Sequence, residues 1–303
     1  MRILISGSSG LIGQALTKSL MPKGHEVLPL KRSAQSAAEL HWDPYCGLID
    51  PLPEIDAAIH LSGENLMGWP WNQSKRQRIF DSRVITTRFL AQSLAALANP
   101  PRVLICASAI GYYGSRPGQT IDEKSDPGTD FLATLCQAWE AATKAAEAAG
   151  IRVVNLRLGI VLSREGGSLP LMRLPFRFGL GARLGNGRQM MSWIAKEDVV
   201  RAVLFLLERS DLQGAVNLTA PQPVSNADFT KLLARTTHFP ALLRVPAFAL
   251  RLLFGQLADA VLLSDIRALS EKLSRAGFRF HFADLESYLR TCFGTNRAAK
   301  LPS

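Results

Sequence analysis

The sequence predicts an α/β protein, in which a doubly wound parallel sheet is followed by a smaller, mainly helical lobe. Over the first 160 residues, short apolar or β-branched runs alternate with stretches whose apolar residues recur at helical spacing, which is typical of parallel strands joined by crossover helices. After residue 160 the alternation gives way to glycine-rich and then mainly helical sequence. We therefore expect a sheet domain over 1–160 and a substrate-side lobe over 161–303, some of whose segments return to the sheet.

The elements of the sheet domain can be placed one by one. Strands are expected at 2–6, 26–30, 57–61, 103–107 and 153–158, and helices at 11–21, 74–97 and 131–148. Gly24 and Gly150 stand where the first and third helices should end, because helices often close on a left-handed residue.

Fewer elements are predicted for the second lobe. Residues 182–194, "ARLGNGRQMMSWI", predict a β-hairpin that turns at Asn186 and Gly187, a pair that favours tight hairpin turns. A helix over 197–208 and strands over 215–220 and 242–246 are expected after it.

Composition and charge restrict the kind of partner. The 303 residues are 47% hydrophobic and carry a net charge of +10, which favours an acidic partner such as nucleic acid, anionic lipid or a phosphorylated small molecule. The densest cationic run, 75–78, has helical periodicity without interleaved aromatic residues, so we interpret it as a solvated helix face and expect no nucleic-acid binding. The longest apolar zone, 239–263, is interrupted by charges and prolines, so no membrane span is expected.

The cysteine pattern indicates a reduced, cytoplasmic protein. Four cysteines lie far apart, with no CxxC pair and no matching histidine pair, so neither disulfides nor a metal site are expected. The first residues lead directly into a predicted strand and do not resemble a signal peptide. The oligomeric state is left open.

A glycine-rich turn lies between the first strand and the first helix. Backbone N–H groups and the positive end of the helix dipole meet there, which suits a pyrophosphate. We therefore expect a dinucleotide to bind at this turn, and an unliganded glycine turn is the alternative. The predicted contacts are Gly7, Ser8, Ser9, Gly10, Leu11, Ile12 and Gly13.

The end of the second strand predicts which dinucleotide binds. It carries Lys31 and Arg32, where an acidic residue would accept hydrogen bonds from a free 2′-hydroxyl of the adenosine ribose. Cationic side chains instead complement a 2′-phosphate. We therefore expect NADP rather than NAD, and two ordinary surface cations are the alternative.

Several stretches resemble, in combination, the epimerase family proteins, an atypical branch of the extended short-chain dehydrogenase/reductases. They are the GxxGxxG turn, "HWDP" (41–44), "HLSGENL" (60–66), "CASAIGYYG" (106–114), "WEAA" (139–142), "LRLGIVL" (156–162), "FRFGLGARLGNGRQMMSWI" (176–194) and "EDVV" (197–200). The resemblance implies an NADP-binding Rossmann domain and a C-terminal domain of unknown function, here at about 250–300. It also implies cofactor contacts at Leu61, Ser62, Gly63, Arg83 and Val161, although Arg83 is equally well explained as a helix-surface residue.

The chain departs from the wider superfamily in its proton-transfer residues. Relatives use Tyr-x-x-x-Lys on the helix after the "YG" strand, and alignment on Glu140 puts Leu132 and Cys136 at these two positions. The usual catalytic hydroxyl falls on Ala109, with Ser108 one residue earlier. Since successive strand residues face opposite sides, this shift could turn the hydroxyl away from the pocket.

Tyr113 is then the best candidate for proton transfer, with Tyr112 and Ser108 after it. The alternative is that both tyrosines are wall or core aromatics with buried hydroxyl hydrogen bonds. Relatives bind a nucleotide-sugar substrate at the segment that here carries Arg177, Arg183, Arg188 and Trp193, which suits an anionic ligand. A polar hairpin that packs on the helical lobe is the alternative.

Two functions follow from these patterns. The first is an NADP-dependent, epimerase-like oxidoreductase that acts on a small polar, nucleotide-sugar-like substrate without the usual tyrosine and lysine. The second is an NADP(H)-binding sensor or partner-binding module that performs no turnover. The missing Tyr-Lys pair favours the second, and the retained glycine-rich substrate segment favours the first. His60, at a strand end, and Asp198, at a helix start, are isolated polar residues for which a structural role is the alternative.

Overall fold

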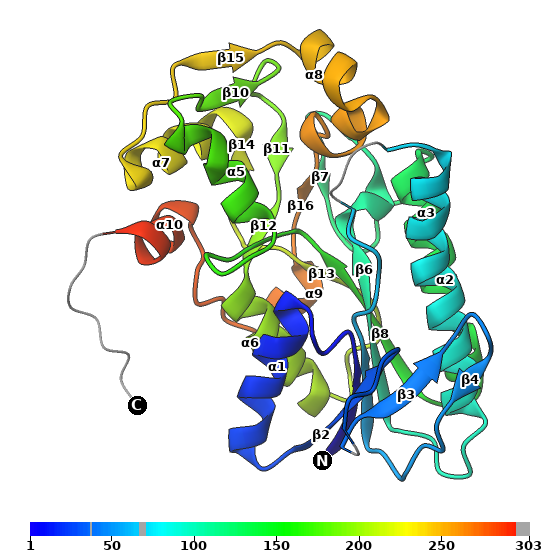
Figure 1. Cartoon of the computed structure of the whole chain (residues 1–303). Coiled ribbons are helices and arrows are strands. Elements are labelled where there is room, and N and C mark those ends of the chain that lie inside the picture. Colours follow the sequence, from blue (N-terminus) through cyan, green and yellow to red (C-terminus); the bar gives the residue numbers. More distant parts are fainter. Residues whose placement is uncertain (37, 67–70, 295–303) are drawn as a thin grey trace.

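The fold is built on an eight-stranded sheet with helices on both faces (Figure 1). It is seen in a computed structural model that describes residues 1–36, 38–66 and 71–294. The strand order is β13-β8-β6-β5-β1-β2-β3-β4, and all neighbours are parallel except β3 and β4. The strands are β1 (Arg2–Ser6), β2 (Glu26–Lys31), β3 (Leu40–Asp43), β4 (Leu48–Ile49), β5 (Ala57–His60), β6 (Val103–Ala109), β8 (Arg152–Leu158) and β13 (Gly214–Leu218). The predicted doubly wound sheet is confirmed.

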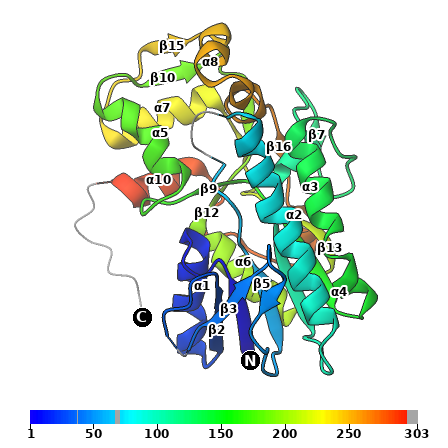
Figure 2. The same cartoon turned by 45° about the vertical axis from the view of Figure 1, so that its right-hand side comes forward.

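Two layers of helices cover the sheet because successive strand residues point to opposite faces. Ile3 and Ile5 pack in the core beneath α1 (Leu11–Leu20) and α6 (Lys196–Glu208), whereas Leu4 packs in the core on the other face. That other face is covered by α2 (Gln73–Ala95), α3 (Phe131–Ala141) and α4 (Lys144–Ala148) (Figure 2).

The helix ends follow the predictions with one exception. Gly24 and Gly150 both have a φ of +79°, as expected for residues that end a helix. The expected helix over 131–148 is interrupted, because α3 ends at Ala141 and α4 begins at Lys144. Between them the Thr143 hydroxyl donates to the carbonyl of Glu140 at 2.7 Å, which gives the backbone a local alternative to helical hydrogen bonding.

A second lobe lies above the carboxyl ends of the strands (Figures 1 and 2). Its core joins Trp193 and Phe229 to Tyr288 and Leu289. The lobe and its connections comprise β7 (Thr120–Ile121), β9 (Ile160–Leu162), α5 (Ser168–Arg177), β10 (Ala182–Leu184), β11 (Met190–Met191), β12 (Trp193–Ala195), β14 (Val224–Ser225), α7 (Asn226–Thr237), β15 (Leu243–Val245), α8 (Ala247–Phe254), a π-helix (Ala258–Leu262), β16 (Arg267–Ala268), α9 (Glu271–Arg275) and α10 (Leu285–Phe293).

The predicted hairpin over 182–194 is wrong. β10 pairs in parallel with β15, and β11 pairs antiparallel with β14, so the two halves of the segment have different partners. A tight turn does form between them, since the N–H of Gly187 donates to the carbonyl of Leu184 at 3.0 Å and Gly187 has a φ of +74°. The N–H of Leu184 donates to the side chain of Asn226 instead of to a hairpin partner.

Asp198 links the end of the chain to the sheet domain. Its buried carboxylate, in the first turn of α6, accepts hydrogen bonds from the N–H groups of His281 and Phe282 at 2.7 and 2.8 Å. This fixes the segment before α10 and gives Asp198 a structural role. In the described parts of the chain, no helix is both long and apolar enough to cross a bilayer. The described residues also contain no cluster of three potential metal ligands.

Candidate functional site

The turn between β1 and α1 is packed so closely that glycine is required. Gly7 has a φ of +73°, and a Cβ atom on it would lie 2.8 Å from the carbonyl carbon of Leu61. A Cβ atom on Gly13 would lie 2.3 Å from the carbonyl oxygen of Gly7. The N–H of Gly10 donates to that same carbonyl at 3.0 Å and closes the turn. Glycine at positions 7 and 13 therefore allows the turn, the start of α1 and the loop after β5 to pack backbone against backbone.

Polar groups of this turn are left without protein partners. The Ser8 hydroxyl is buried and has no hydrogen-bond partner among the described residues. No side chain caps the N-terminus of α1, and its first turn contains no acidic residue. Ser9 is exposed at the rim, while Leu11 and Ile12 begin the helix. An unsatisfied hydroxyl beside an uncapped, positively polarised helix end fits a pyrophosphate.

The loop after β5 forms the opposite wall of the turn. Leu61 and Ser62 lie against Gly7, and the N–H of Leu61 donates to the carbonyl of Ser6 at 3.1 Å. Gly63 follows and is exposed. The structure thus brings the predicted segments 7–13 and 61–63 together at one edge of the sheet, as expected for a ligand crevice in a parallel sheet.

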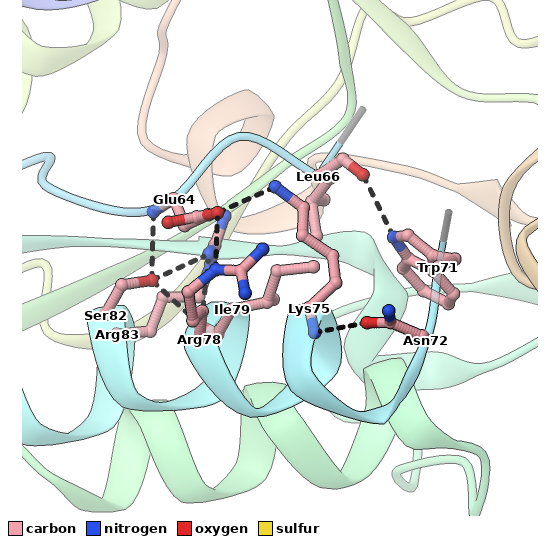
Figure 3. Close-up of polar contacts among 9 residues, drawn as sticks. All are labelled: Glu64, Leu66, Trp71, Asn72, Lys75, Arg78, Ile79, Ser82 and Arg83. Carbon is pink, nitrogen blue, oxygen red and sulfur yellow. Dashed lines mark hydrogen bonds and ion pairs between the residues drawn. The ribbon is translucent and has the colours of Figure 1, made fainter. Parts of the chain in front are cut away.

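Glu64 holds this loop on α2 (Figure 3). Its Oε1 accepts hydrogen bonds from Lys75 Nζ at 2.8 Å and Arg78 Nε at 3.3 Å, and its N–H donates to the Ser82 hydroxyl at 2.9 Å. The hydrogen bond from Lys75 is the main reason that the pKa of Glu64 lies below its usual value. The Lys75 side chain is only 13% exposed, so the prediction of a solvated helix face is wrong for this residue.

Arg83 reaches the same loop from α2 and is not a surface residue. It is only 9% exposed, and its guanidinium carbon lies 3.2 Å from where a Cβ atom on Gly63 would be. It lies over the Trp139 ring at 5.1 Å and donates to the carbonyl of Ile79, but among the described residues it has no carboxylate partner. Burial lowers the pKa of Arg83. A desolvated cation beside the crevice fits an anionic or hydroxyl-rich ligand.

The two cations at the end of β2 differ in whether they form an ion pair with the described residues. Lys31 Nζ forms an ion pair with Glu39 Oε1 at 2.5 Å. Arg32 is exposed and forms no ion pair with the described residues. Of the two predicted 2′-phosphate contacts, Lys31 therefore has a carboxylate partner and Arg32 has none among the described residues.

His60 is an internal residue of the sheet. It is fully buried, shares hydrogen bonds with the hydroxyls of Ser6 and Thr86, and packs edge-on against Trp42. Burial lowers the pKa of His60 to about 3, so the ring is neutral at physiological pH. It couples β1, β5 and α2 beneath the crevice.

Ser108 belongs to a buried ionic network. Its hydroxyl donates to Glu140 Oε1 at 2.7 Å. The same carboxylate accepts two hydrogen bonds from Arg157, from Nε to Oε1 and from Nη2 to Oε2, both at 2.8 Å. Burial alone would lower the pKa of Arg157, but hydrogen bonding and charge attraction from Glu140 outweigh it and raise that pKa. Ser108 thus faces α3, while Ala109 is less buried, as the one-residue shift suggested.

Tyr113 is joined to this network from the core. It is 0% exposed, its hydroxyl donates to Asn217 Oδ1 at 2.7 Å, and it accepts a hydrogen bond from Arg157 Nη1 at 3.0 Å. Burial raises the pKa of Tyr113 to about 12. The two hydrogen bonds of the hydroxyl and its raised pKa both work against proton exchange by Tyr113 at neutral pH.

Tyr112 differs from its neighbour. Its ring is partly exposed and lies 3.4 Å from the Arg157 guanidinium, which covers its face. Among the described residues no hydrogen bond of its hydroxyl is formed. Of the three predicted proton-transfer residues, Tyr112 is the one whose side chain is not locked in the core.

The positions that the resemblance assigns to tyrosine and lysine carry a leucine and a buried cysteine, neither of which exchanges a proton readily at neutral pH. Leu132 and Cys136 face the Ile110–Tyr113 turn, where a Cβ atom on Gly111 would lie 3.3 Å from Leu132 Cβ and 3.9 Å from Cys136 Sγ. Burial raises the pKa of the Cys136 thiol to about 12, so it does not form a thiolate at neutral pH.

Comparison with known proteins agrees with this geometry. The model of the NAD dependent epimerase/dehydratase family matches residues 3–218. The chain belongs to this family. A domain of unknown function, DUF1731, matches residues 245–292, close to the range of about 250–300 expected for such a domain, of which 295–300 lie outside the described residues.

Two members of the family show how close the likeness is. The chain is 46% identical over 282 residues to the epimerase family protein Mb2239 of Mycobacterium bovis, which covers 92% of this chain and 93% of the relative. It is 32% identical over 293 residues to the human epimerase family protein SDR39U1, covering 96% and 99%.

Solved structures agree with the sequence comparison. The crystal structure of human SDR39U1 with NADPH superposes with a TM-score of 0.90 at 31% identity, covering 98% of this chain and 100% of that chain. A nucleoside-diphosphate sugar epimerase from Corynebacterium glutamicum gives a TM-score of 0.81 at 34% identity, covering 97% of this chain and 58% of the other. The Rossmann fold and membership in an NAD(P)-binding family are therefore established.

The residues that the epimerase resemblance suggested for substrate differ in burial and surroundings. Trp193 is 1% exposed, stacks on Tyr288 and donates through its indole N–H to the carbonyl of Gln222. Arg177, at the end of α5, and Arg188 are exposed. Arg183 instead lines a surface cavity of about 450 Å³ with residues of α7 and β15. Val161 lies in β9 opposite Ile194 and, like Ile12, packs against the core that contains Ile3 and Ile5.

Three residues of this epimerase-family site were missed from the sequence. Arg157 lies in a buried strand, where a charged residue needs a partner, and this signal predicts a buried ion pair. Glu140 entered the sequence analysis as the residue on which the tyrosine and lysine positions of α3 were aligned, and not as the ion-pair partner of Arg157. Asn217, inside an apolar strand, is the acceptor for Tyr113, and no local pattern predicts that pairing.

Proposed function

We propose that the protein binds NADPH in the crevice between the glycine turn, the end of β2 and the loop after β5, and acts as an NADP-dependent, epimerase-like oxidoreductase. The observation that carries this proposal is the glycine turn, where, among the described residues, the buried Ser8 hydroxyl has no hydrogen-bond partner and no side chain caps the start of α1. The NADPH bound to human SDR39U1 supports the choice of cofactor. Its substrate is proposed to be small and polar.

Each part of the cofactor has a proposed place in this crevice. Residues 7–13 would hold the pyrophosphate, Arg32 the 2′-phosphate, and 61–63 the adenosine ribose, with Val161 near the nicotinamide. When bound, the cofactor supplies or accepts the hydride. The protein contributes binding, orientation and the proton.

Arg83 is proposed to orient the nicotinamide half of the cofactor. Its cation lies between the loop after β5 and the face of α3 that carries Cys136 and Trp139. This is the α3 face on which the resemblance expects a lysine. A guanidinium supplied from α2 would place a positive charge near the position that Cys136 leaves neutral.

Tyr112 is the proton-transfer residue that we propose in place of Tyr113. Its partly exposed side chain lies beside the crevice end of β6, and Arg157 covers one face of its ring. Tyr113 and Ser108 are proposed to hold the floor of the substrate side, because their hydroxyls already have partners in the network. The sequence analysis ranked Tyr113 above Tyr112 as the proton-transfer residue, and this proposal reverses that order.

The second candidate function, an NADP(H)-binding sensor without turnover, is favoured by one observation. The usual proton-transfer positions are occupied by Leu132 and Cys136, and Ser108 is bonded to Glu140. For either function we propose a cytoplasmic protein, in keeping with four unpaired cysteines, of which three are buried.

NADPH titration tests the binding proposal. Wild-type protein should bind NADPH, and Arg83→Gln should weaken binding about tenfold or more, because a buried charge–ligand hydrogen bond is lost. Arg88→Gln, an exposed position on the same helix, is the matched control and should bind like wild type. Failure of wild-type protein to bind NADPH would contradict the function. Equal affinity of Arg83→Gln and Arg88→Gln would remove Arg83 from the site.

Transfer of deuterium from 4-deuterated NADPH to a panel of small carbonyl compounds and sugar nucleotides separates the two functions. An oxidoreductase should transfer the label, and Tyr112→Phe should lower kcat about 100-fold or more with unchanged NADPH affinity, in the range of general acid catalysis. Protein that binds NADPH but transfers no label to any compound supports the sensor.

A further inference from the structure

The charge at the end of β2 is lower than the sequence suggests. Lys31 and Arg32 together give two positive charges, but the ammonium group of Lys31 is paired with Glu39. The side chains of Lys31 and Glu39 are 29% and 15% exposed, so the pair is partly shielded from solvent. The net charge of the three residues is +1.

Glu39 is held in place by the pairing of β2 with β3 and by two hydrogen bonds. The pairing of Leu30 with Leu40, and of Lys31 with His41, brings Glu39 to the end of β2 just before β3 begins. Its Oε1 accepts from Lys31 and its Oε2 accepts from the N–H of Gln35 at 2.8 Å. These two hydrogen bonds, that of Lys31 first, hold the pKa of Glu39 below its usual value, so it is ionised at neutral pH.

This arrangement has opposite consequences for the two nicotinamide cofactors. A fixed carboxylate within bonding distance of Lys31 repels a 2′-phosphate and reduces the donor capacity of that lysine. A free 2′-hydroxyl carries no charge and donates a hydrogen bond, so a carboxylate at this edge does not disfavour it. Of the two cations at the end of β2, Arg32 is then the one that offers the phosphate a charge unpaired among the described residues.

We infer that Glu39 is a specificity-determining residue, which pairs with Lys31 and thereby limits how strongly the site prefers NADPH over NADH. The inference rests on the proposed cofactor site. Arg32 is the phosphate ligand in this arrangement, and Lys31 acts only to the extent that Glu39 releases it.

Titration of the full-length protein with NADPH and with NADH tests the inference. Glu39→Gln should tighten NADPH about fivefold and change NADH less than twofold, the size of effect expected for a partly exposed charge. Glu26→Gln is the matched control, because Glu26 lies at the other end of β2 in an exposed ion pair with Arg2. It should leave the ratio of the two affinities unchanged.

Repeating Glu39→Gln in a protein without Lys31 distinguishes release of the Lys31 charge from a change in backbone conformation. In Lys31→Met protein the further change Glu39→Gln should tighten NADPH by less than the fivefold gain expected with Lys31 present, since only the direct repulsion between Glu39 and the phosphate remains to be relieved. An unchanged affinity ratio in Glu39→Gln, or the same gain in the Lys31→Met background, would overturn the inference while NADPH binding stands. Loss of binding of both cofactors by wild-type protein would instead reject the proposed function.

Discussion

The proposed cofactor crevice has a nucleotide side and a substrate side, built at the same edge of one sheet, and the two differ in how their polar groups are satisfied. On the nucleotide side, at the ends of β1, β2 and β5, the Ser8 hydroxyl lacks a partner and Arg83 lacks a carboxylate among the described residues. On the substrate side, at the ends of β6 and β8, Ser108, Tyr113 and Arg157 are bonded within one network.

The difference distinguishes polar groups that are free to bind a ligand from polar groups whose hydrogen bonds are already made within the protein. A buried polar atom without a partner costs free energy, so folds retain it where a ligand supplies the missing bond. A network whose members satisfy one another stabilises the fold but has no free donor for chemistry. Cofactor binding and proton transfer therefore respond differently to substitution on the two sides.

The largest effect on stability is expected on the substrate side. Glu140→Gln should lower the free energy of unfolding by about 3–5 kcal/mol, because it leaves the Arg157 charge buried without a counter-charge. Glu286→Gln breaks the exposed pair with Arg290 and should cost less than about 0.5 kcal/mol. Denaturant unfolding compares the two. Equal losses would show that the Glu140 pair is no more important than a surface pair.

Substitution on the nucleotide side should mainly lower the affinity for NADPH. Gly13→Ala places a methyl group where 2.3 Å separates it from the Gly7 carbonyl, so the turn must open and NADPH should bind about 100-fold more weakly. Gly166→Ala meets only a side chain at 3.5 Å and should bind NADPH normally. Calorimetric titration measures both. Unchanged binding by Gly13→Ala would place the cofactor elsewhere.

A smaller effect should distinguish the adjacent tyrosines. Tyr113→Phe leaves Asn217 and Arg157 each short of one buried hydrogen bond and should cost about 1–3 kcal/mol of unfolding free energy. Tyr112→Phe removes no hydrogen bond formed within the described protein and should change stability by less than about 0.5 kcal/mol. NADPH affinity should stay the same in both. A stability loss in Tyr112→Phe equal to that in Tyr113→Phe would erase the distinction.

The sequence predicted the nucleotide side better than the substrate side. Residues 7–13 and the ends of β2 and β5 are local segments, and their placement follows from strand order and from the glycine spacing. The structure brings these segments together as expected. Which residues contact the cofactor stays a prediction.

The network on the substrate side depends on contacts distant in sequence. Tyr113 and Asn217 are 104 residues apart, and Ser108 and Glu140 are 32 apart. Periodicity shows that a residue is buried but not which polar group it meets. The hairpin prediction at Asn186 and Gly187 was wrong for the same reason, because the partners of β10 and β11 lie in later segments. The pairing of Lys31 with Glu39 depends on the register of β3, a strand that the sequence reading did not include.

The ionisation of Tyr113 tests most directly whether the substrate side has become structure. Tyrosine labelled with ¹³C at Cζ, assigned by Tyr113→Phe, can be titrated by NMR in the presence of NADPH. Burial raises the pKa of Tyr113 to about 12, so its signal should not titrate below about pH 11. An apparent pKa of Tyr113 below 8 in the NADPH-bound protein would show an activated proton-transfer residue and contradict this account.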